Sequence, residues 1–384
     1  MITTGLEAIS FHIPHRYIAL DTLAEQHNVD PDKFSKGIGQ EKITLPGHDE
    51  DIITMAADAA LPILQRTGVE NIDTVLFATE TGVDQSKAAS IYLHSLLKLP
   101  PNCRCIELKQ ACYSATAALQ MACSYVARKP DQKVLVIASD VARYDRDSSG
   151  EATQGAGAVA MLVSSNPKVL EVGTVSGLFT EDIMDFWRPN YRRTPLFDGK
   201  ASALRYMNAL LETWRDYRAN GGLSYNDFQY FCFHLPFSRL GEKAHRHLAK
   251  ANKTPANMDQ ALPGMVYNRQ VGNCYTASIY LSLLSILENT QEDLTGAAIG
   301  MFSYGSGATA EFFDTKVLSG YREHLFTQRH QALLNERIAV SYEDYVALWE
   351  EADLTQGTPN EARGHFRLVG IEDDKRIYID CRTA

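Results

Sequence analysis

The feature that most constrains the fold is a series of short, nearly continuous apolar runs that alternate with segments of helical periodicity. The apolar runs include TVLFATE (74–80), KVLVIASD (133–140) and AAIGMFSYGSG (297–307). Such runs are expected for strands that are covered on both faces. Helical patterns lie between them, for example at 87–99 and 111–129. Strands that alternate with helices predict an α/β protein.

The order of these elements repeats once along the chain. In the first half a strand ends at Glu80 and Cys112 precedes a helix; in the second half a strand reaches His234 and Asn273 precedes a helix. Each half then closes with a strand, a Gly-rich loop and a second strand. The repetition lies in element order and not in residue identity, and it suggests an internal duplication.

We expect one half over residues 1–165, carrying the glutamate and cysteine, and the other over residues 166–384, carrying the histidine. Residues 180–222 interrupt the strand rhythm. They are expected to form a loop and a long amphipathic helix, as an insertion beside a binding site. The charged segment 340–384 is expected to form a helix and a closing pair of strands.

Composition excludes several classes of partner. The 384-residue chain carries a net charge of −10, which disfavours binding to nucleic acid or an anionic membrane. No window of about 18 residues is continuously apolar, so we predict no membrane span. Seven cysteines in a long chain do not indicate a disulfide framework. We therefore predict a cytoplasmic protein, and no metal site, since Cys103 and Cys105 lack further zinc ligands.

Cys112 is the first candidate for chemistry, in the stretch LKQACYSATAALQ. A helix that starts there would present its positive dipole end and unpaired N–H groups, which favour the thiolate. The small neighbours Ala111, Ser114 and Ala115 leave room for an acyl group. On this stretch alone, a buried inert thiol is the alternative.

Two further candidates lie at strand ends. Glu80 follows the apolar strand TVLFAT, where desolvation would raise its pKa and suit it to acid–base work; a solvated turn is the alternative. His234 ends the run FQYFCF and could polarise a carbonyl or carry a proton, unless it is an ordinary core histidine.

Binding residues are less specific. Asn273 and Ser306 sit at a helix start and in a Gly-rich turn, where they could hydrogen bond a ligand or serve as a cap and a turn residue. Arg239 and Lys243 are four residues apart, so they would share a helix face and could take a phosphate-bearing ligand or simply face solvent.

Taken together, these stretches resemble the bacterial-type 3-hydroxy-3-methylglutaryl-CoA (HMG-CoA) synthase family over nearly the whole chain. The motifs occur in family order: GIGQEK (37–42), ATETGVDQSKAA (78–89), KQACYSATAALQ (109–120), EATQGAGAVAM (151–161), DFWRP (185–189), FHLPFSRLGEKA (233–244), VGNCYTASIYLSLLSILEN (271–289) and FSYGSGATAEFF (302–313). The resemblance implies a thiolase-like fold, with two pseudo-repeated halves in a five-layered α/β/α/β/α sandwich, and a homodimer.

The resemblance also implies an activity of the mevalonate pathway, with acetyl-CoA and acetoacetyl-CoA as substrates and no other cofactor. Cys112 matches the nucleophile that becomes acetylated, and Glu80 the acid/base that removes a proton from the acetyl methyl group. His234 matches the residue that orients and polarises the acetoacetyl ketone. The implied CoA- and substrate-binding or supporting residues are Arg239, Lys243, Asn273, Ser306, Tyr144 and Asp140.

Alternative functions remain open at this point. The motif KQACYS, with Gln110, resembles more closely the enzymes of the branch that installs β-methyl groups on polyketides bound to acyl carrier proteins. The basic stretch RPNYRR (188–193) could dock such a carrier. An initiating β-ketoacyl synthase would also use Cys112, His234 and Asn273, although it has no need of Glu80. A catalytically inactive interaction protein would have lost one of these residues.

Overall fold

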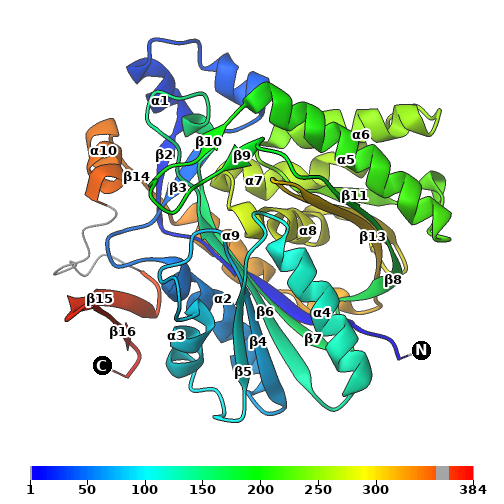
Figure 1. Ribbon diagram of the computed structural model, residues 1–384, viewed down its shortest axis with the longest axis horizontal. Helices are drawn as coiled ribbons and strands as arrows, with labels where there is room; N and C mark the ends of the chain where they lie inside the picture. The colour runs from blue at the N-terminus through cyan, green and yellow to red at the C-terminus, as the bar shows by residue number, and fades with distance from the viewer. Residues whose placement is uncertain (1, 352–362, 384) are drawn as a thin grey trace.

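The structure is a computed structural model that describes residues 2–351 and 363–383 (Figure 1). The first half forms five strands of a central sheet. Its elements are β1 (Gly5–His12), α2 (Ile52–Thr67), β4 (Ile72–Ala78), α3 (Ala89–Leu96), β5 (Arg104–Leu108), α4 (Ser114–Arg128), β6 (Lys133–Val141) and β7 (Ala156–Ser164). β4 is parallel to both β5 and β6, whereas β7 is antiparallel to β6 and β1.

The second half repeats most of this order. Its elements are β8 (Leu170–Thr180), α5 (Gly199–Ala219), β11 (Tyr230–Phe233), α6 (Ser238–Ala251), α7 (Val266–Val271), α8 (Ser278–Asn289), β12 (Ala298–Gly305) and β13 (Thr309–Val317). The predicted repeat of element order is confirmed, except that short 3-10 turns and α7 stand where the first half has β5.

One sheet of nine strands joins the halves, in the order β11-β12-β13-β8-β1-β7-β6-β4-β5. The seam between β1 and β8 is short, with Gly5 opposite Glu171 and Leu6 opposite Leu170. Gly5 permits this approach, because a Cβ atom at that position would lie 2.1 Å from the carbonyl oxygen of Leu170. The two halves therefore meet along a seam in which position 5 admits no larger side chain.

The helices and the two halves of the sheet form five layers, as the resemblance implies. Helices α2 and α3 pack on the outer face of the first half, and α5 and α6 on that of the second. Between the halves lie α4 and α8, whose buried side chains share one apolar core with strands of both halves. Their hydroxyl groups also meet, since Thr116 Oγ1 lies 2.9 Å from the Tyr280 hydroxyl.

The segment 180–222 is only in part an insertion. Helix α5 packs against β8 and β13, and it buries Tyr206, Leu210 and Tyr217 as part of the outer layer. The expectation that this helix is inserted is therefore wrong, because its apolar face completes the core. The loop 181–198, with the short strands β9 (Phe186–Trp187) and β10 (Leu196–Phe197), lies outside the repeat.

The chain after β13 returns to the first half. Its elements there are α9 (Thr327–Asn335), β14 (Ile338–Ala339), α10 (Tyr342–Glu351), β15 (Phe366–Glu372) and β16 (Lys375–Asp380). β14 pairs with β2 (Arg16–Ala19), which also pairs with β3 (Lys42–Leu45), while α10 packs on α1 (Leu20–Gln26). The expected helix and strand pair are thus present, with part of the segment, 352–362, outside the described residues. In the described part of the chain no helix is long and apolar enough to cross a membrane.

Candidate active site

Cys112 lies between β5 and α4, two residues before the helix begins. Its thiol donates a hydrogen bond to Oε1 of Glu80 at 2.9 Å. The preceding residue, Ala111, has a φ of 44°, in the left-handed region that residues with a Cβ atom rarely adopt. Because β4 and β5 are parallel neighbours, their carboxyl ends deliver Glu80 and Cys112 to the same edge of the sheet.

The electrostatics of this pair differ from the expectation for a cysteine at a helix N-terminus. Burial, and then the charge of Glu80, raise the pKa of Cys112 well above that of an ordinary thiol. Burial, and then the charge of Asp140, raise the pKa of Glu80 to about 8. The helix dipole is worth about 1 kcal/mol, so desolvation and two carboxylates outweigh it. The resting pair is therefore a thiol that donates to a carboxyl group, which can take the proton when the sulfur attacks.

Asp140 lies at the end of β6 and is fully buried. Its Oδ1 accepts hydrogen bonds from the backbone N–H of Glu80 (2.9 Å) and of Thr81 (3.0 Å). The hydroxyl groups of Thr79, Thr81 and Thr276 also donate to this carboxylate. Asp140 does not line the cavity described next; it holds the backbone of Glu80, which fits the supporting role that the resemblance implies, and direct contact with a ligand stays a prediction.

A cavity of about 220 Å³ brings the other candidates together, since Cys112, Tyr144, His234, Asn273 and Ser306 all line it. These residues come from both halves of the chain, and the cavity lies where the strand ends meet.

His234 follows β11 directly, and burial lowers its pKa to about 3. The ring is therefore neutral at physiological pH. Its Nδ1 atom is buried and has no hydrogen-bond partner among the described residues. The backbone is held on both sides, since His234 N–H donates to the Phe302 carbonyl at 2.9 Å and the Tyr206 hydroxyl donates to the His234 carbonyl at 2.7 Å. A neutral imidazole with a fixed backbone suits the polarisation of a substrate carbonyl.

The two polar neighbours are oriented by their surroundings. Oδ1 of Asn273 accepts from the backbone N–H of Tyr275 (2.9 Å) and the hydroxyl of Ser278 (3.0 Å), so its NH₂ group remains as a donor for a ligand. Ser306 follows β12, and its carbonyl accepts from the Gln110 side chain at 3.3 Å.

Arg239 and Lys243 lie on α6, one turn apart, as predicted. Neither lines the cavity, but Leu240 between them does. Lys243 is exposed, while Arg239 forms an ion pair with Glu242 at 2.6 Å. They are therefore placed beside the cavity and not inside it.

Sequence reasoning expected the segment 180–222 beside a binding site but did not name the side chains with which it contributes to the site. Phe186 and Phe197 form a cross-strand pair between β9 and β10, and their rings lie 6.0 and 5.2 Å from that of Tyr144. Arg188, in the same loop, donates a hydrogen bond to the Glu80 carbonyl. The motif DFWRP was recognised, but nothing in its pattern shows that it folds back over Cys112.

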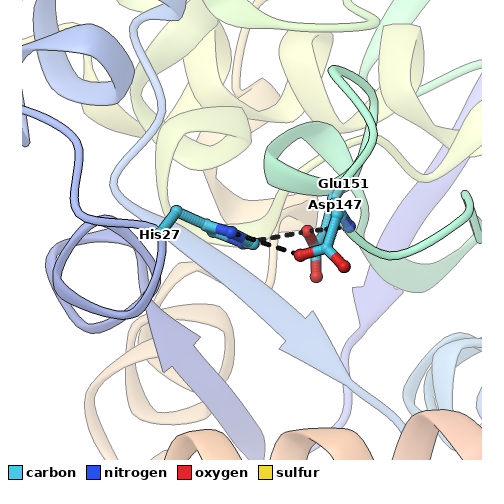
Figure 2. Close-up of side chains that lie close together, drawn as sticks. All are labelled: His27, Asp147 and Glu151. Atoms are coloured by element: carbon cyan, nitrogen blue, oxygen red, sulfur yellow. Dashed lines mark hydrogen bonds and ion pairs between the residues drawn. The ribbon is translucent and has the colours of Figure 1, made fainter.

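Within the described residues, one group of side chains is spaced closely enough to hold a metal ion: His27, Asp147 and Glu151 (Figure 2). Nδ1 of His27 lies 3.3 Å from Oδ1 of Asp147, and Nε2 lies 3.1 Å from Oε2 of Glu151. The carboxylates thus face different nitrogens of the ring, whereas a metal ion would bind one of them. We interpret the group as a hydrogen-bonded bridge between α1 and the loop 142–155.

A five-layered sandwich with a thiol–carboxyl pair, whose thiol lines one cavity with a histidine, defines a thiolase-like α/β protein. A model of the hydroxymethylglutaryl-coenzyme A synthase N-terminal domain matches residues 2–168. A model of the C-terminal domain of the same family matches residues 169–260 and 246–360. The chain therefore belongs to the hydroxymethylglutaryl-CoA synthase family.

Individual relatives agree with this assignment. The chain is 42% identical to hydroxymethylglutaryl-CoA synthase of Enterococcus faecalis, over 98% of this chain and 100% of the relative. It is 33% identical to the polyketide biosynthesis 3-hydroxy-3-methylglutaryl-ACP synthase PksG of Bacillus subtilis (strain 168), over 99% and 97%. A crystal structure of an HMG-CoA synthase complexed with CoA superposes with a TM-score of 0.92 at 40% identity, covering 98% of this chain and 99% of that one.

Proposed function

We propose that this protein is an acyltransferase that condenses acetyl-CoA with acetoacetyl-CoA and water to give HMG-CoA and free CoA, as a step of the mevalonate pathway. The observation that carries the proposal is the 2.9 Å hydrogen bond from the Cys112 thiol to Glu80, beside a cavity that His234 also lines. Family membership and the similarity to the Enterococcus enzyme support it.

The first step transfers the acetyl group. As the Cys112 sulfur attacks the thioester carbonyl of acetyl-CoA, Glu80 takes the thiol proton and CoA leaves as a thiol once it is protonated. The product is an acetyl group on Cys112. A covalent thioester divides one difficult condensation into easier steps.

The second and third steps form the carbon–carbon bond and release the product. Glu80 removes a proton from the acetyl methyl group, and the resulting carbon nucleophile adds to the ketone of acetoacetyl-CoA. The neutral His234 ring donates to the developing alkoxide, which then takes up the proton that Glu80 carries. Water cleaves the Cys112 thioester, which gives the carboxylate of HMG-CoA and restores the thiol. These steps require proton and acyl transfers but no redox cofactor.

Asn273 and Ser306 are proposed to contact the acetoacetyl group, since they line the same cavity. Arg239 and Lys243 are proposed to contact CoA phosphates from the adjoining face of α6. We also propose a cytoplasmic location, because all seven cysteines are free.

The roles are tested with radiolabelled acetyl-CoA and product analysis. Cys112→Ala should carry no label. Glu80→Ala should still take up label, at a lower rate, yet form no HMG-CoA, because the methyl proton then has no acceptor. Label on the Cys112→Ala protein, or HMG-CoA from Glu80→Ala at the wild-type rate, would contradict the assignment.

A carrier-protein substrate is the second candidate, supported by the similarity to PksG and by a cavity of about 430 Å³ that Arg188, Arg192 and Arg193 help to line. Parallel assays with acetoacetyl-CoA and with an acetoacetyl carrier protein distinguish the two. Faster turnover of the carrier-bound substrate would favour the polyketide branch.

We further propose a homodimer. β5 is an edge strand of the sheet, and its Ile106 is 39% exposed. Met184, which is 69% exposed, and Ile106 line one surface cavity beside β5. An uncovered edge strand with apolar side chains favours pairing with a second chain.

Light scattering tests the dimer and should show twice the mass of one chain. Ile106→Lys should shift the measured mass towards that of a single chain. A wild-type mass of one chain would rule the dimer out.

A further inference from the structure

Tyr144 forms part of the wall beside Cys112, and both of its backbone polar groups are held by side chains. It belongs to one small apolar cluster with Cys112. Its N–H donates to Oε1 of Gln154 at 2.8 Å, and its carbonyl accepts from the indole N–H of Trp349 at 3.2 Å. Trp349 lies on α10, 205 residues further along the chain. A residue of the site is therefore fixed from the C-terminal part of the protein.

A second residue of α10, one turn earlier, holds the same loop. Tyr345 is fully buried. Its hydroxyl accepts from Nε2 of Gln154 at 3.0 Å and donates to Oε1 of Glu151 at 2.8 Å. Because Gln154 also accepts from Tyr144, a continuous chain of hydrogen bonds runs from α10 to the backbone of Tyr144.

α10 is itself anchored on two sides. The Trp349 indole lies close to two guanidinium groups, those of Arg193 (4.9 Å) and Arg146 (5.8 Å). On the other side, His27, the residue directly after α1, contacts Glu151, the carboxylate to which Tyr345 donates (Figure 2). Cation–π contacts and buried hydrogen bonds of this kind restrict a helix to one placement.

We propose that Tyr345 and Trp349 are positioning residues, through which α10 holds Tyr144 against Cys112 in the geometry that acyl transfer requires. The proposal rests on the proposed function in taking Cys112 as the site of acetylation. Small displacements of a group beside the reacting atoms reduce rates strongly, so loss of one hydrogen bond to the Tyr144 backbone should be visible in the chemistry.

The test compares two matched variants. Trp349→Phe removes the indole donor but keeps an aromatic ring near the arginines. Trp214→Phe is the control, because Trp214 donates to Asn252 at 3.2 Å in the outer layer of the second half. We expect the rate of Cys112 acetylation to fall about fivefold or more in Trp349→Phe and to stay within about twofold in the control. Equal rates in the two variants would overturn the proposal.

A double-mutant cycle separates positioning from general support. If Trp349 acts through Tyr144, then Trp349→Phe should have little further effect on acetylation in a Tyr144→Ala background. The same loss in both backgrounds would contradict the proposal. Tyr345→Phe, which removes a single oxygen atom, carries the same comparison should Trp349→Phe unfold.

Alkylation of Cys112 by iodoacetamide gives a readout that needs no CoA substrate. A loosened Tyr144 should expose the thiol and speed its alkylation about threefold in Trp349→Phe, but not in Trp214→Phe. Unchanged alkylation in both would count against the positioning role. A wild-type protein that takes no acetyl label, while the alkylation rates still differ, would instead show that the proposed function is wrong.

Discussion

At the scale of single residues, desolvation controls the chemistry of the site. The Cys112 thiol donates to Glu80 across 2.9 Å in a place where neither charge is well solvated. Burial therefore keeps the thiol protonated until a substrate arrives, and it raises the pKa of Glu80 to about 8. A carboxyl group with a pKa near the working pH is suited to both taking and returning a proton.

The raised pKa of Glu80 predicts a pH-dependent stability. The carboxyl group keeps its proton in the folded chain up to about pH 8 but loses it near 4.5 when unfolded. Between these values the folded state binds more protons, so its contribution is full below about pH 4.5 and is lost as the pH rises through 8. As the pH rises through this range, the urea concentration at the unfolding midpoint should therefore fall for the wild type relative to Glu80→Gln.

The measurement is a series of urea unfolding midpoints at fixed pH. Glu292→Gln, at an exposed loop position, is the control and should follow the wild type. A constant difference between wild type and Glu80→Gln from pH 5 to 9 would show that the carboxyl group has an ordinary pKa.

At the scale of elements, strand ends and one loop assemble the site. β4, β5 and β11 deliver Glu80, Cys112 and His234, while the loop 181–198 covers them. This loop is tied down by Asp185, whose carboxylate accepts from the Tyr304 hydroxyl at 2.7 Å and the Gly307 N–H at 3.0 Å. The sheet thus sets where the reacting groups lie, and the loop sets their surroundings.

The same loop tunes Glu80. The guanidinium of Arg188 lowers the pKa of Glu80, in opposition to burial. Its removal in Arg188→Gln should therefore raise the pKa of Glu80. The acetylation rate should increase with pH as Glu80 loses its proton, and the midpoint of this increase should move to higher pH in the variant. Arg188→Lys retains the charge and should keep the midpoint near that of the wild type. A pH–rate profile of all three proteins checks this, and identical midpoints would remove Arg188 from the electrostatics of the site.

At the scale of the whole molecule, buried polar contacts connect helices α7, α8 and α9 to the first strand, β1. His330 of α9 is fully buried, and its Nδ1 lies 2.7 Å from Glu288 of α8. Its Nε2 accepts from the backbone N–H of Phe11 in β1 at 3.1 Å. The Tyr267 hydroxyl of α7 donates to the other oxygen of Glu288 at 2.6 Å. The imidazole of α9 therefore joins α8 to β1, and α7 is linked to it through Glu288.

Removal of this ring should be costly. His330→Ala leaves a buried carboxylate and a backbone donor with fewer partners, and we expect a loss of about 3 kcal/mol in the free energy of unfolding. Guanidinium denaturation measures the loss. Lys36→Ala, which breaks an exposed ion pair with Asp32, should leave the midpoint unchanged. Equal midpoints for the two variants would show that the contacts of His330 contribute nothing net.

Much of the fold and of the site was predictable from local pattern. Apolar runs predicted the strands, and strand ends predicted Glu80 and His234, because parallel strands direct their carboxyl ends to one edge. The hydrogen bonds of Trp349 and Tyr345 were not predictable. They join residues about 200 positions apart, and no periodicity records such contacts. Helix α5 was misjudged for a related reason, since its amphipathic pattern does not say which sheet it covers.

The amino-acid sequence by itself determined the alternation of strands and helices, the repeat of their order, and the identity of the groups that gather at the strand ends. Only the tertiary structure decided the protonation of Cys112, the place of Asp140 behind Glu80, and the return of the C-terminal segment onto the first half. The physical reason is that propensity and periodicity act between neighbours along the chain. Desolvation and charge depend on every group within a few ångströms, wherever the chain has brought it from.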